Sequence, residues 1–202
     1  MAPPHTPCRH TSAVVLAGGR AARMGGEDKC LLPLAGRPLV AWLIDALRPQ
    51  VEDMLISANR NLERYAAFGP PLVQDRLDDF QGPLAGIMAA LERCRGDCLL
   101  SAPGDAPLLA PDYAARMRAA LAASGARACV AEFQGRRQPV YCLLSKELGT
   151  HLQQWLDAGG RAVHDWLAAV DAVGVDFSDR PQQFLNLNRP DDLARLEAQV
   201  SA

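Results

Sequence analysis

Ser12 to Leu39 reads S-A-V-V-L-A-G-G-R-A-A-R-M-G-G-E-D-K-C-L-L-P-L-A-G-R-P-L, and this stretch decides the fold. Its apolar run over residues 13–17 predicts a buried strand. The run stops at Gly18-Gly19, and Arg20, Arg23, a second glycine pair and Lys29 follow within a dozen residues. Glycines let backbone amides approach an anion, and Arg and Lys neutralise phosphate charge. A strand that leads into such a loop predicts a polyphosphate site.

The spacing of this loop excludes two common phosphate-binding motifs. A P-loop would end in Gly-Lys-Ser/Thr, and a dinucleotide fold would show G-x-G-x-x-G, and neither pattern is present. A glycine-rich turn that binds nothing is the plain alternative. The convergence of two glycine pairs and three cations favours the anion site over that alternative.

The rest of the chain alternates predicted strands with predicted helices. This order predicts an α/β fold with a mostly parallel central sheet and helices on both faces. After residue 127 two strands are joined by the polar turn 134–137, which predicts a mixed second half over the same sheet. We expect a disordered leader over 1–11 and one domain over 12–202. The predicted strands are 53–57, 72–73, 98–101, 127–133, 139–144 and 172–175, and the predicted helices are 39–47, 82–94, 111–123, 146–156, 161–170 and a last one after Pro190.

Composition narrows the class of protein. The chain has 202 residues and a formal net charge of −2, which argues against a nucleic-acid-binding surface as its main function. No apolar run is long enough to span a bilayer, and the first residues lack the apolar core of a signal peptide. The six cysteines form no C-x-x-C pair, so we expect reduced thiols and a cytoplasmic protein.

Four predicted strands end in polar or glycine residues, at 18–19, 57–60, 74–75 and 101–105. Because ligands of open α/β sheets bind at the carboxyl ends of the strands, we expect these ends to ring one crevice. Asp105 follows a buried strand and is flanked by prolines. A single rigid aspartate suits Mg²⁺, which takes one or two carboxylates and leaves its other positions to water and phosphate oxygens.

Residues 16–29, L-A-G-G-R-A-A-R-M-G-G-E-D-K, resemble the signature L-A-G-G-x-x-x-R-M-G-x-D-K of nucleotidyltransferases that make nucleoside-diphosphate sugars and related molecules, with one residue more before D-K. The doubled glycine in R-M-G-G-E-D-K resembles one branch, the molybdenum cofactor guanylyltransferases. G-P-L-A-G at 82–86 and F-L-N-L-N at 184–188 extend the resemblance, which covers Ser12 to Leu196. It implies a Rossmann-like nucleotidyltransferase fold and Mg²⁺-dependent transfer of GMP from GTP to the terminal phosphate of molybdopterin carrying molybdenum, with release of pyrophosphate. It also implies molybdoenzyme maturation proteins as partners.

Two alternatives stay open. One is a sibling enzyme, either a molybdopterin cytidylyltransferase or a sugar-phosphate nucleotidyltransferase. The other is a non-catalytic nucleotide-binding module that serves as an assembly partner. The Arg23–Lys29–Asp105 set favours an enzyme.

The resemblance assigns roles residue by residue. Three positions depart from the family pattern: Ser57 replaces an asparagine, Gly104 replaces the cysteine of C-D-x-P, and Arg189 replaces a threonine. The Ser57 hydroxyl can keep one hydrogen bond of two, and Asp75 can accept from either guanine or ribose. The implied catalytic residues are Arg23, Lys29 and Asp105; the nucleotide contacts are Leu16, Ala17, Gly18, Gly19, Lys29, Ser57, Asp75 and Asp105; Asp105 holds the metal; and Gln138, Pro139, Asn186 and Asn188 contact the acceptor.

Overall fold

Seven strands form one central sheet in the order β5-β4-β1-β6-β8-β7-β9. The structure is a computed structural model that describes residues 8–17, 28–75 and 82–185. Among the strands within these residues only β8 runs against its neighbours, and the other pairings in the sheet are parallel, which confirms the predicted mostly parallel sheet. The strands are β1 Thr11–Leu16, β4 Asp53–Ser57, β5 Leu72–Val73, β6 Cys98–Pro103, β7 Ala128–Phe133, β8 Arg136–Ser145 and β9 Val173–Asp176, with a separate hairpin of β2 Pro33–Leu34 and β3 Arg37–Pro38.

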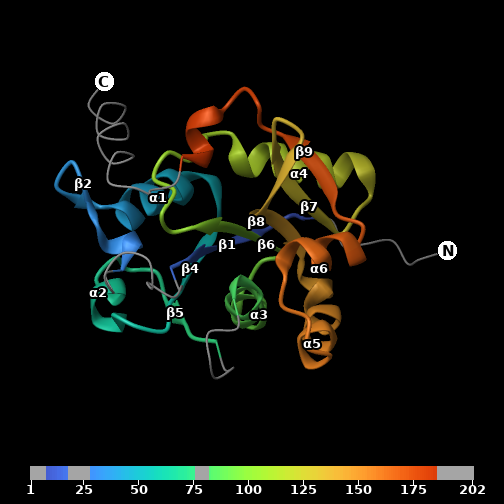
Figure 1. The fold of residues 1–202 in the computed structure, drawn as a ribbon, viewed down its shortest axis with the longest axis horizontal. Coiled ribbons are helices and arrows are strands. Elements are labelled where there is room, and N and C mark those ends of the chain that lie inside the picture. The colour runs from blue at the N-terminus through green and yellow to red at the C-terminus, as the bar shows by residue number, and fades with distance from the viewer. Residues whose placement is uncertain (1–7, 18–27, 76–81, 186–202) are drawn as a thin grey trace.

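Helices cover both faces of the sheet, as the alternating pattern predicts (Figure 1). Helices α1 Leu39–Leu47 and α4 Tyr113–Ser124 pack on one face. Helices α3 Pro83–Arg93, α5 Gly149–Asp157 and α6 Val163–Ala169 pack on the other. None of the described helices is long and apolar enough to span a membrane. The shorter helical elements are η1 Lys29–Leu31, η2 Arg48–Gln50, α2 Leu62–Ala66, η3 Lys146–Leu148 and η4 Pro181–Phe184.

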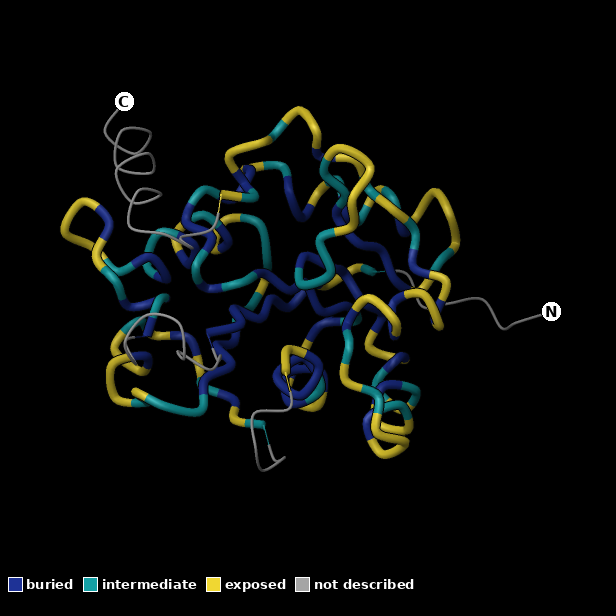
Figure 2. Tube along the Cα trace, in the orientation of Figure 1, coloured by how far each residue is buried: buried dark blue, intermediate teal, exposed yellow. Residues whose placement is uncertain are grey.

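Strand β1 shows why the opening run has no polar alternation. Ala13 and Val15 face the core beneath α1 and α4, whereas Val14 and Leu16 face the core beneath α3. All four side chains are buried, so both faces of the strand must be apolar. Figure 2 shows this buried trace running through the middle of the molecule.

The hairpin between β7 and β8 is tighter than the predicted turn 134–137. Gln134 and Gly135 have φ angles of 50° and 72°, so two residues complete the turn. Arg136 already pairs with Phe133, and Arg137 pairs with Glu132. The prediction was wrong at its C-terminal end because a polar side chain does not reveal that its backbone has joined a strand.

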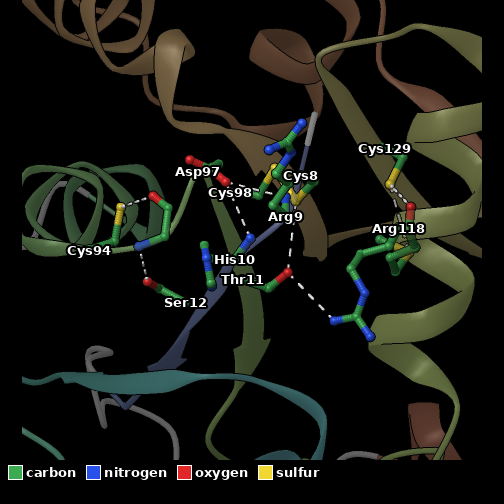
Figure 3. Close-up of a disulfide and its surroundings, with 12 residues drawn as sticks. Cys8, Arg9, His10, Thr11, Ser12, Cys94, Asp97, Cys98, Arg118 and Cys129 are labelled. Atoms are coloured by element: carbon green, nitrogen blue, oxygen red, sulfur yellow. Dashed lines mark hydrogen bonds between the residues drawn. A yellow bond between two sulfur atoms is a disulfide. The ribbon is translucent and has the colours of Figure 1, made fainter. Parts of the chain in front are cut away.

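The residues before the sheet are tied to it. Strand β1 begins at Thr11, a residue that was predicted to lie in the disordered leader. The amides of Arg9 and His10 donate to the Asp97 carboxylate over 3.2 Å each, and Cys8 forms a disulfide with Cys98 at the start of β6 (Figure 3). The expectation that all six cysteines are reduced was therefore wrong. The two Cα atoms lie 5.5 Å apart, within the range a disulfide spans, although the partners are 90 residues apart in sequence.

Candidate functional site

The carboxyl ends of β5, β4, β1 and β6 lie along one edge of the sheet, called here the carboxyl edge. Leu16 is in register with both Ser57 and Pro103, and Ser57 with Val73. Three backbone hydrogen bonds continue the sheet beyond the strands: Ala17 to Ser57 (2.9 Å), Ala58 to Val73 (3.1 Å) and Gly104 to Leu16 (2.9 Å). The predicted gathering of these strand ends is confirmed.

Asp105 stands one residue beyond Gly104 on this edge and is half-buried. Burial raises the pKa of its carboxyl, while the positive charge of Lys29 lowers that pKa by a smaller amount. The turn is closed by a 3.1 Å hydrogen bond from the Ala106 amide to the Pro103 carbonyl. Two of the three predicted catalytic residues thus lie near enough for the charge of Lys29 to act on Asp105.

The position of Lys29 is set by the preceding residue, Asp28. Asp28 is buried, and its carboxylate accepts a 3.0 Å hydrogen bond from the Asn61 side chain and pairs with Arg60 at 3.7 Å. Its carbonyl accepts from the Leu31 amide over 2.9 Å, which starts η1 with Lys29 as its first residue. Asp28 therefore anchors η1 to the loop that follows β4.

Tyr65 contacts the residues on either side of Lys29. The side chain, carried by α2, is fully buried, and its hydroxyl lies 3.4 Å from the Ala17 carbonyl and within hydrogen-bonding reach of Asp28 and Cys30. Burial raises the pKa of this phenol, so it stays a neutral donor.

Sequence reasoning missed Asp28, Arg60, Asn61 and Tyr65 as site residues. The letters D-K and N-R were a signal for the first two, because both belong to the quoted motifs. Asn61 and Tyr65 carried no local signal.

Ser57 lies against helix α3. The side chain is buried, and a Cβ added to Gly86 would collide with the Ser57 hydroxyl and meet Leu16 Cδ2 at 3.3 Å. Gly86 in G-P-L-A-G therefore permits the close packing of α3 on the sheet. The predicted contact between Ser57 and a nucleotide stays a prediction.

Asp75 is held by its backbone. Its amide donates to the Asn59 side-chain oxygen over 3.1 Å, and the residue is half-buried. Asn59 thus shapes the chain after β5.

The β7–β8 hairpin contains two of the predicted acceptor contacts. Gln138 and Pro139 are half-buried in β8, and the Gln138 amide donates to the Arg136 carbonyl over 3.2 Å. Arg137 pairs with Glu132 at 3.4 Å and donates to the Ala172 carbonyl over 2.9 Å. The Arg137 guanidinium therefore ties β8 to β7 and to the residue before β9.

Tyr141 is a further residue that the sequence did not single out. It is buried in β8, and the negative charge of Asp105 contributes to raising its pKa, second to burial. Its hydroxyl donates to the Gln183 carbonyl over 2.9 Å, which ties η4 to the neighbourhood of Asp105. The predicted residues Gly18, Gly19, Arg23, Asn186 and Asn188, the departure at Arg189 and the helix after Pro190 lie outside the described residues.

The family of this chain is shown by its similarity to known proteins. A family model described as a MobA-like NTP transferase domain matches residues 13–173. The chain belongs to the MobA-like NTP transferase family. A relative from Shewanella loihica, named molybdenum cofactor guanylyltransferase, is 43% identical over 189 residues, which cover 94% of this chain and 96% of the relative. A relative of the same name from Shewanella halifaxensis is 43% identical over 184 residues, covering 91% of this chain and 92% of that one.

Solved structures share the fold of this MobA-like chain. The molybdopterin-guanine dinucleotide biosynthesis protein A of Archaeoglobus fulgidus superposes with a TM-score of 0.78 at 22% identity, covering 94% of this chain and 98% of that one. The 2-C-methyl-D-erythritol 4-phosphate cytidylyltransferase of Thermus thermophilus gives a TM-score of 0.70 at 17% identity, over 94% and 98% of the two chains. These likenesses confirm the predicted nucleotidyltransferase fold.

A divalent cation fits the donor set of this MobA-like site. Among residues 8–17, 28–75 and 82–185, no group of three or more His, Cys, Asp and Glu side chains is placed to cage a metal. Asp105 supplies one carboxylate at the end of a rigid strand, and burial disfavours its charged form. Mg²⁺ commonly binds through one or two carboxylates with substrate phosphates and water, and its charge would compensate that of Asp105.

Proposed function

We propose that this chain transfers GMP from GTP to the terminal phosphate of molybdopterin carrying molybdenum. The observation that carries the proposal is the approach of Lys29 to Asp105 on the carboxyl edge of a MobA-like chain. Relatives named molybdenum cofactor guanylyltransferase, 43% identical over nearly the whole chain, support the choice of donor and acceptor. Because the product is a cofactor for other enzymes, we also propose molybdoenzyme maturation proteins as partners.

The reaction needs no covalent enzyme intermediate. The acceptor phosphate is already anionic at neutral pH, so its oxygen attacks the α-phosphorus of GTP without a general base. The new oxygen–phosphorus bond forms as the bond to the β-phosphate oxygen breaks, and pyrophosphate leaves. The barrier comes from charge repulsion, so positioning and electrostatic stabilisation supply the catalysis.

Each residue has a stated task in this proposal. Asp105 would hold Mg²⁺, which supplies positive charge to the triphosphate when bound. Lys29, seated on Asp28 and η1, neutralises charge that moves onto the α-phosphate and the pyrophosphate. Arg23 and the amides of Gly18 and Gly19 complete the phosphate contacts.

Recognition of the base is proposed for the ends of β1 and β5. The Ala17 amide is already bonded to Ser57, but the carbonyls of Leu16 and Ala17 each accept one hydrogen bond and keep a second lone pair. Those oxygens and the Asp75 carboxylate are acceptors, which suits the N1–H and N2–H₂ donors of guanine. Gln138, Pro139, Asn186 and Asn188 remain the proposed acceptor contacts.

The test is a pyrophosphate-release assay with each of the four nucleoside triphosphates, molybdopterin and Mg²⁺. We expect release with GTP that depends on both molybdopterin and the metal. Equal release with CTP would favour the cytidylyltransferase sibling. Release with a sugar phosphate but not molybdopterin would favour the other sibling, and no release with any pair would indicate a binding module.

A further inference from the structure

Gly104 occupies a position in which an added side chain would displace a neighbour. A Cβ added there would lie 2.9 Å from the Cys30 sulfur, closer than real Cβ atoms come to their neighbours. It would also lie 3.3 Å from the Leu16 carbonyl oxygen and 3.4 Å from the Ala17 Cα. The Cys30 sulfur is the closest of these atoms and would have to shift, while the Leu16 oxygen lies on a strand and leaves an added methyl group little room on its other side.

Cys30 fills this space as a neutral side chain. It is buried in η1, and burial raises the pKa of its thiol, with the negative charges of Asp105 and Asp28 adding to the effect. A buried, protonated cysteine behaves as a small hydrophobe and packs like one. The thiol therefore packs between η1 and the end of β6.

The positions of these two residues in sequence give the contact its importance. Cys30 directly follows Lys29, and Gly104 directly precedes Asp105. The Gly104 amide is bonded to Leu16, so the end of β6 cannot move away from β1 without losing that 2.9 Å hydrogen bond. Any added volume at the contact is expected to displace η1 instead, and Lys29 with it.

We propose that Cys30 and Gly104 are a matched pair of positioning residues whose contact sets the separation of Lys29 from Asp105. The glycine leaves the space that the thiol fills. This pairing also accounts for the departure at residue 104, since a chain with cysteine at 30 has no room for the cysteine of C-D-x-P. The inference rests on the proposed function only through the catalytic roles of Lys29 and Asp105.

A mutant cycle tests the pair in the full-length protein. The variants are Gly104→Ala, Cys30→Ala and the double variant, with Gly149→Ala as the matched control. Gly149 is the first residue of α5, and a Cβ there meets nothing within 4 Å. We expect Gly104→Ala to lower kcat for pyrophosphate release by roughly ten- to a hundredfold, because small displacements of catalytic groups have effects of this size. Cys30→Ala should lower kcat less, and the double variant should recover to the level of Cys30→Ala.

A second readout does not depend on activity. The rate of Cys30 alkylation in the native protein is followed by mass spectrometry of the peptide that contains it. The wild-type thiol should react slowly because it is buried, Gly104→Ala should speed the reaction by displacing it, and Gly149→Ala should not. If Gly104→Ala does not fold, recovery of folded protein in the double variant supports the pairing.

Three results would overturn the proposal. They are wild-type kcat and labelling in Gly104→Ala, a double variant as slow as Gly104→Ala, and a double variant that fails to fold alongside it. A wild-type protein that releases no pyrophosphate would refute the proposed function, while the labelling comparison would still decide the contact.

Discussion

Lys29 lies close enough to Asp105 for its ammonium charge to lower the pKa of the Asp105 carboxyl, although burial has the larger effect and the net shift is upward. Burial therefore disfavours the charged carboxylate that the proposed chemistry needs, at a cost to the stability of the fold. Groups needed for function at such sites lower the stability of the fold, and variants that remove them show this loss as a gain in stability.

Asp105→Asn should remove the metal-holding charge and lower the rate of GMP transfer by roughly a hundredfold or more. The same variant should be more stable than wild type at pH 7. The folded pKa of Asp105 is raised, so the stability it contributes is full below its unfolded pKa of about 3.8 and is lost as pH rises through the folded value. Thermal unfolding between pH 3.5 and 8 checks this: the two curves should converge at the acid end.

Asp179→Asn is the matched control for that experiment. Asp179 is exposed, and its hydrogen bond with Arg116 lowers its pKa, so the sign is reversed. Its contribution to stability is present above the unfolded pKa and lost as pH falls through the folded one. This variant should be no more stable than wild type at pH 7 and should keep the wild-type transfer rate. A gain in stability here, or none in Asp105→Asn, would contradict the assignment.

Lys29→Ala should reduce kcat for pyrophosphate release by about a hundredfold while raising the KM for GTP far less. The reason is that negative charge on the leaving pyrophosphate is greatest in the transition state. Lys146→Ala is the control, because this lysine donates to the Cys94 carbonyl at the C-terminal end of α3, before β6 begins. A change confined to the KM of GTP would make Lys29 a ground-state contact.

The chain should prefer GTP to CTP by about ten- to a hundredfold in kcat/KM for each guanine contact, since an unpaired buried polar group costs roughly 1–3 kcal/mol. Asp75→Ala should lower kcat/KM with GTP by a larger factor than it lowers kcat/KM with CTP, so the ratio of the two should fall. Asp45→Ala, which removes an exposed carboxylate paired with Arg37, is the control. Unchanged selectivity in Asp75→Ala would assign base recognition to the backbone or to Ser57.

Tyr141→Phe should loosen η4, because its hydroxyl donates to the Gln183 carbonyl over 2.9 Å. The lost hydrogen bond is worth about 1 kcal/mol of unfolding free energy. We expect the KM for molybdopterin to rise while the KM for GTP stays near wild type, because the chain continues from η4 to the proposed acceptor residues Asn186 and Asn188. Steady-state kinetics with each substrate varied in turn would show this, and an equal rise in both constants would contradict it.

In the absence of a reductant, Cys8→Ala should lower the free energy of unfolding by up to about 4–5 kcal/mol. This is the chain-entropy effect of opening a loop of this length. The disulfide joins residues 90 apart. Adding a reductant should destabilise the wild-type protein by a similar amount and leave Cys8→Ala unchanged. Equal response of both proteins to the reductant would exclude the Cys8–Cys98 bond.

The sequence by itself determined the first strand, the helices predicted over 39–47 and 82–94 and the place of Asp105. These features follow from local patterns: an apolar run bounded by glycine, helical spacing that ends at a breaker, and an aspartate directly after a buried strand. Parallel order then brings strand ends to one edge, so Ser57, Asp75 and Asp105 could be expected to gather there.

Only the tertiary structure decided which residues support that site. The Asp28–Asn61 hydrogen bond, the Tyr141–Gln183 bond and the Cys8–Cys98 disulfide each join segments far apart in the chain. The exclusion of a side chain at Gly104 likewise depends on where the Cys30 thiol comes to rest. No periodicity or motif encodes such contacts, because they arise from the close packing of elements whose relative positions are set by the whole core.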